Sequence, residues 1–140
     1  MKPIKQITWF IFILIVQASC EKIDGPAKNV FQTWEVNQFI SIESAVYAKN
    51  TGTQILLTIN PDHTYQLQLD VNSCGGKLLS ISELGIIFDS PTCTEACCDS
   101  DFAQRFVKLL ASISMYKVDG DTLRLSVPGW GFIECVRTTN

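Results

Sequence analysis

Histidine, clusters of basic residues and long hydrophobic runs are scarce in this chain of 140 residues, and each scarcity argues against a class of function. The single histidine, His63, lies in a turn-forming segment, and no Gly-x-Ser-x-Gly motif supplies a nucleophile for it. No basic patch interleaved with aromatic residues is present, so nucleic acid is not an expected partner. The Cys-x-x-Cys motif of thiol–disulfide exchange enzymes is missing as well. We therefore expect neither an enzyme nor a nucleic-acid-binding protein.

The N-terminal segment has the pattern of a secretory signal. Lys2 and Lys5 precede an apolar run over residues 7–16, which only Thr8 interrupts and which small residues follow. This run is well short of the roughly 20 residues that a membrane-spanning helix needs. We expect residues 1–19 to be a signal peptide.

The end of this signal resembles that of bacterial lipoproteins, in which small residues precede a lipid-modified cysteine. Ala18 and Ser19 precede Cys20 in this way. The resemblance implies cleavage before Cys20 and acylation of the new N-terminus, and more than one acyl chain anchors a protein stably. The protein would then be lipid-anchored in the cell envelope, at the outer membrane. Residues 20–29, with Asp24-Gly25-Pro26, are expected to form a flexible tether.

The mature chain is expected to be acidic. Without Lys2 and Lys5, nine basic residues stand against fourteen acidic ones, a net charge of −5. Such a body is not attracted electrostatically to anionic lipid. We therefore expect the membrane to be a partner through the N-terminal lipid alone.

Residues 30–140 are expected to form a single β-rich domain. Apolar residues that alternate with polar ones predict strands with these inward-facing side chains: Trp34, Val36, Ile40, Ile42, Ile55, Leu57, Ile59, Tyr65, Leu67, Leu69, Val71, Leu123, Leu125 and Val127. Asn37-Gln38 is expected to mark a bend, and Cys74-Gly75-Gly76 to break a strand. Trp130 is expected in the core at the start of a final strand that runs to Arg137.

One amphipathic helix is predicted near residues 100–113. Its apolar stripe consists of Phe102, Phe106, Leu109, Leu110 and Ile113. Asp101 and Gln104 have the spacing of a capping box, and Glu95 and Asp99 also suit a helix start. Most connections between the seven or eight expected strands are too short for a parallel crossover. We therefore predict a mainly β (α+β) fold, a curved antiparallel sheet or barrel that the helix closes.

Lipidation of the first cysteine leaves five, and disulfides are the usual state of cysteines in an exported protein of this size. Cys74 is expected to pair with Cys97 or Cys98, and Cys93 with the other of these two or with Cys135. Because five is odd, at least one thiol stays free or pairs between molecules. Alternatively, Cys74, Cys93, Cys97 and Cys98 could hold zinc or copper(I) as four thiolates.

Four features of the sequence resemble the META domain of bacterial heat-shock lipoproteins. These are a strand that begins with Trp34, an Asn-Ser-Cys-Gly-Gly segment at 72–76, a Thr–Cys segment before the helix, and two closing strands. The resemblance covers roughly residues 30–138. It implies a compact β-rich envelope domain without established catalytic residues.

These observations predict a non-enzymatic binding or structural module that is anchored in the cell envelope by lipid. We assign no catalytic, cofactor-binding or metal-ligating residue, and Asp119-Gly120-Asp121 lacks the remaining ligands of a calcium loop. One alternative is a lipocalin-like carrier, because a curved antiparallel sheet can enclose a small apolar ligand. Another is a cysteine-based metal or redox protein. The protein or small-molecule partner is left open.

Overall fold

The computed structural model describes residues 26–139, so the expected signal peptide, Cys20 and most of the tether lie outside the described residues. The described elements are η1 (Lys28–Val30), β1 (Thr33–Ser41), β2 (Val46–Ala48), β3 (Leu56–Ile59), β4 (Thr64–Gln68), β5 (Ser73–Ile81), β6 (Ile86–Phe88), β7 (Thr92–Cys93), α1 (Asp101–Leu110), β8 (Met115–Asp119), β9 (Thr122–Val127) and β10 (Gly131–Arg137). None of the helices described is long and apolar enough to cross a membrane.

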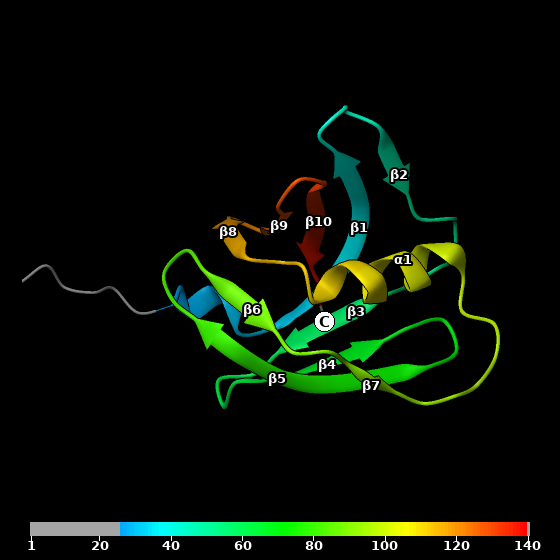
Figure 1. The fold of residues 1–140 in the computed structure, drawn as a ribbon, viewed down its shortest axis with the longest axis horizontal. Helices are drawn as coiled ribbons and strands as arrows, with labels where there is room; N and C mark the ends of the chain where they lie inside the picture. Colours follow the sequence, from blue (N-terminus) through cyan, green and yellow to red (C-terminus); the bar gives the residue numbers. More distant parts are fainter. Residues whose placement is uncertain (1–25, 140) are drawn as a thin grey trace, which may run out of the picture.

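The strands form a strongly curved antiparallel sheet in the order β6-β5-β4-β3-β1-β10-β9-β8, with β2 beside β1 and β7 beside β5. The two ends of this order meet. Gly85 forms an isolated bridge with Met115, and the Tyr116 amide donates a hydrogen bond to the Leu84 carbonyl at 2.9 Å. The sheet is therefore a nearly closed barrel, which α1 covers (Figure 1). The predicted fold class is confirmed.

The helix packs its apolar stripe into the barrel, as predicted. Phe102, Phe106 and Leu110 are buried, and the Phe102 ring centroid lies 4.5 Å from that of Phe39 in β1. The predicted capping box is wrong, because Ser100 is the N-cap and its hydroxyl accepts a hydrogen bond from the Ala103 amide. Ser100 also has a partner across the chain, since its amide donates to an Asp70 carboxylate oxygen at 3.0 Å.

Strand β1 contains a β-bulge where the sequence suggests a bend. Its register against β10 shifts between Val36 and Gln38, which reverses the face on which later side chains lie. Phe39 is therefore fully buried, whereas Ile42 beyond the strand end is 71% exposed. The predicted inward placement of Ile40 and Ile42 is wrong for this reason.

Strand β5 runs through both glycines that were expected to break it. Gly76 lies opposite Tyr65 of β4, and a Cβ atom at Gly76 would lie 2.6 Å from the Tyr65 hydroxyl oxygen. The same Cβ atom would also overlap a carboxylate oxygen of Asp89. Glycine is needed here because two side chains cross the strand, and not because the strand ends.

Two apolar residues expected in the core lie elsewhere. Val71 lies in the turn between β4 and β5 and is 54% exposed, because the strand pattern ends at Gln68 and no longer sets which way its side chain points. Trp130 is half-buried, and its ring stands edge-on to that of Phe39 at a centroid distance of 6.2 Å.

The interior of the barrel is filled by large side chains. One continuous core contains the following fully buried residues: Trp34, Tyr65, Phe39, Phe88, Phe106, Ile55, Leu57, Ile59, Leu67, Ile86, Leu110 and Ile113. Polar side chains therefore lie at the ends and on the outer faces of the barrel.

Candidate functional site: the cysteine loop

The segment between β7 and α1, residues 94–100, carries two of the cysteines and is here called the cysteine loop. A disulfide joins Cys74 of β5 to Cys93 of β7 at its base. These residues are direct neighbours in the antiparallel β5–β7 pair, so the bond staples the start of the loop to the sheet. The predicted pairing of Cys74 with Cys97 or Cys98 is wrong, because those residues lie further along the loop.

Cys135 lies on β10 with its side chain in the core, opposite Val36. Burial raises the pKa of its thiol, because the charged thiolate would lose its hydration. Its predicted pairing with Cys93 is wrong, and it forms no disulfide with any other cysteine of residues 26–139. Cys135 acts as a small core residue.

Asn72 holds the cysteine loop to the end of the sheet. It is the one buried polar side chain among residues 26–139. Its amide nitrogen donates to the Ala96 carbonyl at 2.7 Å and to an Asp99 carboxylate oxygen at 2.6 Å. Its amide oxygen accepts from the Ala96 amide and from the Thr94 hydroxyl, both at 2.8 Å. All four hydrogen-bonding positions of this side chain are thus used on one loop.

Asp99 also holds the loop to the sheet, and Asn72 and Asp99 together are here called the clamp. One oxygen accepts hydrogen bonds from the Val71 amide at 2.9 Å and the Asn72 amide at 3.1 Å. Burial alone would raise the pKa of Asp99, but these bonds and that from the Asn72 side chain stabilise the carboxylate and lower it overall. The expectation that Asp99 serves only as a helix-start charge misses this contact with the β4–β5 turn.

Between the two clamped points, Ala96 and Asp99, lie the adjacent thiols of Cys97 and Cys98. Both side chains are exposed, and neither forms a disulfide within the described part of the chain. Hydrogen bonding with the Cys97 side chain raises the pKa of Cys98, because it favours the protonated thiol. Cys98 has a φ of 87°, in the left-handed region that a non-glycine residue seldom adopts. The loop therefore presents a pair of neighbouring thiols on a backbone held at both sides.

An apolar hollow of about 190 Å³ lies beside the cysteine loop, against α1. Leu69, Cys93 and Val107 supply its apolar wall, and Asp99 and Gln104 are at its rim. The Gln104 side chain donates to the Asp99 carbonyl at 2.9 Å, which ties the helix to the loop. Sequence periodicity places Val107 outside the apolar stripe and gives no sign of this hollow.

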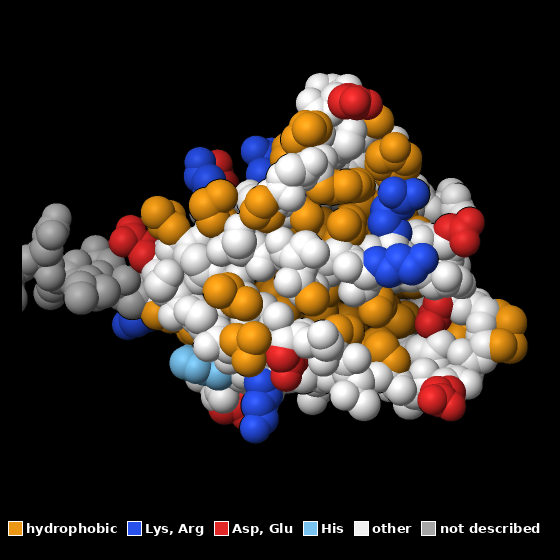
Figure 2. Space-filling view, in the orientation of Figure 1, with side chains coloured by type: hydrophobic (Ala, Val, Ile, Leu, Met, Phe, Trp, Pro, Cys, Tyr) orange, Lys and Arg blue, Asp and Glu red, His pale blue; other side chains and the backbone are white. Residues whose placement is uncertain are grey.

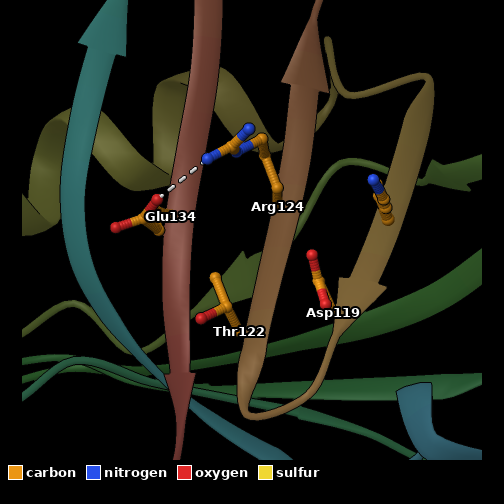
Figure 3. Close-up of a pocket in the computed structure, with 5 residues that line it drawn as sticks. Asp119, Thr122, Arg124 and Glu134 are labelled. Carbon is orange, nitrogen blue, oxygen red and sulfur yellow. Dashed lines mark hydrogen bonds and ion pairs between the residues drawn. The ribbon is translucent and has the colours of Figure 1, made fainter.

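A polar hollow of about 210 Å³ lies on the outer face of β8, β9 and β10. Figure 3 shows Arg124 and Glu134 pointing toward each other across β9 and β10, with Asp119 and Thr122 nearby. The Arg124 guanidinium lies 3.3 Å from a Glu134 carboxylate oxygen, and Gln38 donates to the other oxygen at 2.8 Å. Arg124, Glu134 and Gln38 thus satisfy one another as a cross-strand group on this face.

The structure does not assemble the four-thiolate metal site. Cys74 and Cys93 use their sulfur atoms in a disulfide, so only Cys97 and Cys98 remain as thiols in the loop. No group of three or more His, Cys, Asp or Glu side chains suited to a metal ion occurs among the described residues. His63 is exposed in the turn between β3 and β4, as the sequence predicts.

The fold and this site define a small antiparallel barrel, closed by one helix, with a disulfide-stapled and hydrogen-bonded loop at the helix entrance. No protein-family model and no curated protein matches the chain. A solution NMR structure of a protein from Burkholderia xenovorans is similar, with a TM-score of 0.66 and 15% identity over 84% of this chain and 85% of that one.

A crystal structure of a DUF4847 family protein from Bacteroides vulgatus is also similar. Its TM-score is 0.58 at 14% identity, over 79% of this chain and 94% of that one. At such low identities these likenesses establish the fold alone.

Proposed function

We propose that this protein is a lipid-anchored module of the cell envelope that binds or supports a partner and does not catalyse a reaction. The observation that carries the proposal is the Cys74–Cys93 disulfide within the folded domain. Such bonds persist in oxidising compartments outside the cytosol. The disulfide therefore agrees with export by the N-terminal signal pattern and with acylation at Cys20.

The filled barrel favours a module of this kind over a lipocalin-like carrier. Trp34, Phe39 and Phe106 come from different parts of the chain and meet as fully buried side chains in one core. A carrier needs space for its ligand where these side chains lie. The hollows described above lie at the outer surface, where a partner rather than an enclosed ligand would be bound.

The resemblance to the META domain belongs to the same proposal. The disulfide joins the two segments on which the resemblance rests, Asn72–Gly76 and the Thr–Cys segment that ends at Cys93. In this interpretation the bond fastens the segment before the helix to strand β5.

The test is the mass of the mature protein, measured with and without reductant. We expect the mass of residues 20–140 plus acyl chains, and an increase of about two hydrogen masses on reduction of one disulfide. Cys20→Ala should move the protein from the membrane fraction to the soluble fraction, since the acyl chains provide the anchor. Unchanged fractionation of Cys20→Ala would refute the lipid anchor.

The exposed pair Cys97 and Cys98 favours a second candidate function, thiol–disulfide exchange. One thiolate would attack a partner's disulfide and release one partner thiol. The neighbouring thiolate would then displace the second partner thiol and leave a Cys97–Cys98 disulfide, so that the pair loses the two electrons that the partner gains. Two thiols suffice for this reaction, whereas the metal hypothesis needs more ligands than the loop provides.

Exchange is tested by incubating the protein with glutathione disulfide and then alkylating it without reductant. The wild type should lose two alkylation sites, and Cys97→Ser should lose at most one, as a mixed disulfide. Cys135→Ala is the matched control and should behave like the wild type, because Cys135 is buried. Full alkylation of the wild-type pair after incubation would eliminate this candidate.

A further inference from the structure

Four large apolar side chains are exposed on the outer surface where the barrel closes. They are Leu79 on β5, Leu84 in the following turn, Ile87 on β6 and Met115 on β8, and they are here called the seam patch. Their exposed fractions are 69%, 64%, 42% and 53%. A soluble surface seldom gathers large apolar groups in this way unless it makes contact with something.

Strand pairing brings the members of the seam patch to neighbouring positions. In the β5–β6 pair, Ser80 lies opposite Ile87, and the register shifts between Leu78 and Ser80. Leu79 is the residue at this shift and is therefore a near neighbour of Ile87. On the other side, Met115 bridges to Gly85, the neighbour of Leu84. Figure 2 shows groups of apolar side chains over β5, β6 and β8, on the side of the molecule where Figure 1 places η1.

The described chain begins directly beside this patch. The Ala27 amide donates a hydrogen bond to the Tyr116 hydroxyl at 3.0 Å, and that hydroxyl donates to the Ser82 carbonyl at 2.8 Å. Tyr116 follows Met115, and Ser82 belongs to the same turn as Leu84. Ala27 is therefore held at the edge of the seam patch by a buried tyrosine.

The distance from this point to the expected anchor is short. Ala27 lies seven positions after Cys20, and a fully extended chain spans at most about 25 Å over that number. If Cys20 carries the acyl chains, Ala27 lies within about 25 Å of the membrane surface. The seam patch, which begins beside Ala27, is then held close to the membrane as well. Other ends of the domain are under no such constraint.

We propose that the seam patch rests on the lipid surface and orients the domain, with the cysteine loop directed away from the membrane. This inference rests on the proposed lipid anchor and extends it, because it assigns the barrel a lipid contact of its own. We assign the contact to the four apolar side chains of the patch, because Lys77, Lys117 and Glu83, which lie near them in the sequence, together add a charge of only +1. A membrane of zwitterionic lipid is therefore sufficient for it.

The opposite end of the molecule carries several acidic side chains, with Val71 as its one large exposed apolar residue among residues 26–139. Figure 1 places the cysteine loop, between β7 and α1, at the far end from η1, where the described chain begins. That end carries the acidic residues Glu95, Asp99 and Asp101. The orientation therefore leaves Cys97 and Cys98 accessible to a partner, while the barrel seam faces lipid.

The test uses the full, lipidated protein reconstituted in phosphatidylcholine vesicles whose acyl chains carry bromine. Leu84→Trp places a fluorescent reporter in the seam patch. Ile42→Trp is the matched control, because Ile42 is a similarly exposed apolar residue just beyond the distant end of β1. Bromine quenches indole fluorescence only at short range. If the seam patch lies at the acyl boundary, the fluorescence of Leu84→Trp should be quenched roughly twofold more than that of Ile42→Trp.

Flotation of the wild-type protein with the vesicles separates the two proposals. A protein that floats, but whose Leu84→Trp reporter is quenched no more than Ile42→Trp, overturns the orientation and leaves the anchor intact. A protein that does not float overturns the anchor and the orientation together. Leu79→Trp provides a second reporter in the patch if the thermal unfolding of Leu84→Trp differs from that of the wild type.

Discussion

At the scale of single residues, Asn72 and Asp99 connect the end of the sheet to the cysteine loop. Both side chains direct their hydrogen bonds to backbone groups that strands and helix leave unpaired. A buried polar group without such partners would cost about 1–3 kcal/mol. The conformation of the loop therefore depends on two residues that carry no apolar signal in the sequence.

Asn72→Ala should lower the free energy of unfolding by about 2–3 kcal/mol, because it removes four part-buried hydrogen bonds that hold the loop to the sheet. Asn50→Ala, in an exposed turn, is the matched control and should change stability by less than about 0.5 kcal/mol. Guanidinium denaturation measures both. Equal stabilities for the two variants would show that the clamp does not hold the loop.

Asp99 should make the stability of the domain sensitive to acid. Its pKa is lowered in the folded state, so its carboxylate stabilises the fold above the unfolded value of about 3.9 and this contribution is lost as the pH falls through the lower folded value. Asp99→Asn should therefore show a shallower loss of stability below about pH 4 than the wild type. Urea denaturation between neutral pH and about pH 2 tests this, with the exposed Glu95→Gln as the control. Parallel curves for the wild type and Asp99→Asn would contradict it.

At the scale of elements, strand β5 is shaped by its two glycines. Gly76 admits the Tyr65 ring and the Asp89 carboxylate, whereas a methyl group added at Gly75 would meet only the Tyr65 carbonyl oxygen, at 3.4 Å. The Tyr65 hydroxyl donates to the Asp89 carbonyl at 2.9 Å across this opening. The absence of a side chain at Gly76 therefore lets Tyr65 of β4 cross β5 and reach Asp89, directly after β6.

Gly76→Ala should destabilise the domain by at least about 2 kcal/mol, since its methyl group would overlap Tyr65 and Asp89. Gly75→Ala, on the same strand, should cost less than about 1 kcal/mol because its methyl group fits. Thermal unfolding of the two variants gives the comparison. If they unfold at the same temperature, the close approach at Gly76 does not decide the path of β5.

At the scale of the whole molecule, the disulfide, the helix and the barrel seam divide the domain into two ends. Cys74 and Cys93, 19 positions apart in the sequence, close a loop and fasten the helix entrance to β5. The seam lies at the other end, where the first described residues meet Tyr116. In our proposal the stapled end faces a partner and the seam end faces the membrane.

Replacing both Cys74 and Cys93 with serine should lower the free energy of unfolding by about 3 kcal/mol in the chain-entropy model for a loop of this length. Cys97→Ser with Cys98→Ser is the matched double variant and should change stability by less than about 1 kcal/mol, because both side chains are exposed. Chemical denaturation without reductant measures the difference. Loss of stability in the second variant alone would mean that the disulfide lies elsewhere.

The sequence by itself determined the barrel class, the helix and most of the inward-facing residues. Ile55, Leu57 and Ile59 are buried as their alternation predicts, and the stripe through Phe106 faces the core. These features can be predicted because the spacing of apolar residues within one segment indicates which face of a strand or helix packs against the core. The N-terminal signal pattern is local in the same sense, although its residues lie outside the described part of the chain.

Only the tertiary structure decided how distant segments meet. The partner of Cys74 follows from the β5–β7 register, and the burial of Phe39 follows from a bulge against β10. The clamp joins Asn72 to Asp99, which are 27 residues apart, and the seam patch is assembled from β5, β6 and β8. Long-range pairing fixes all of these, and a pattern within one segment carries no information about its partner strand.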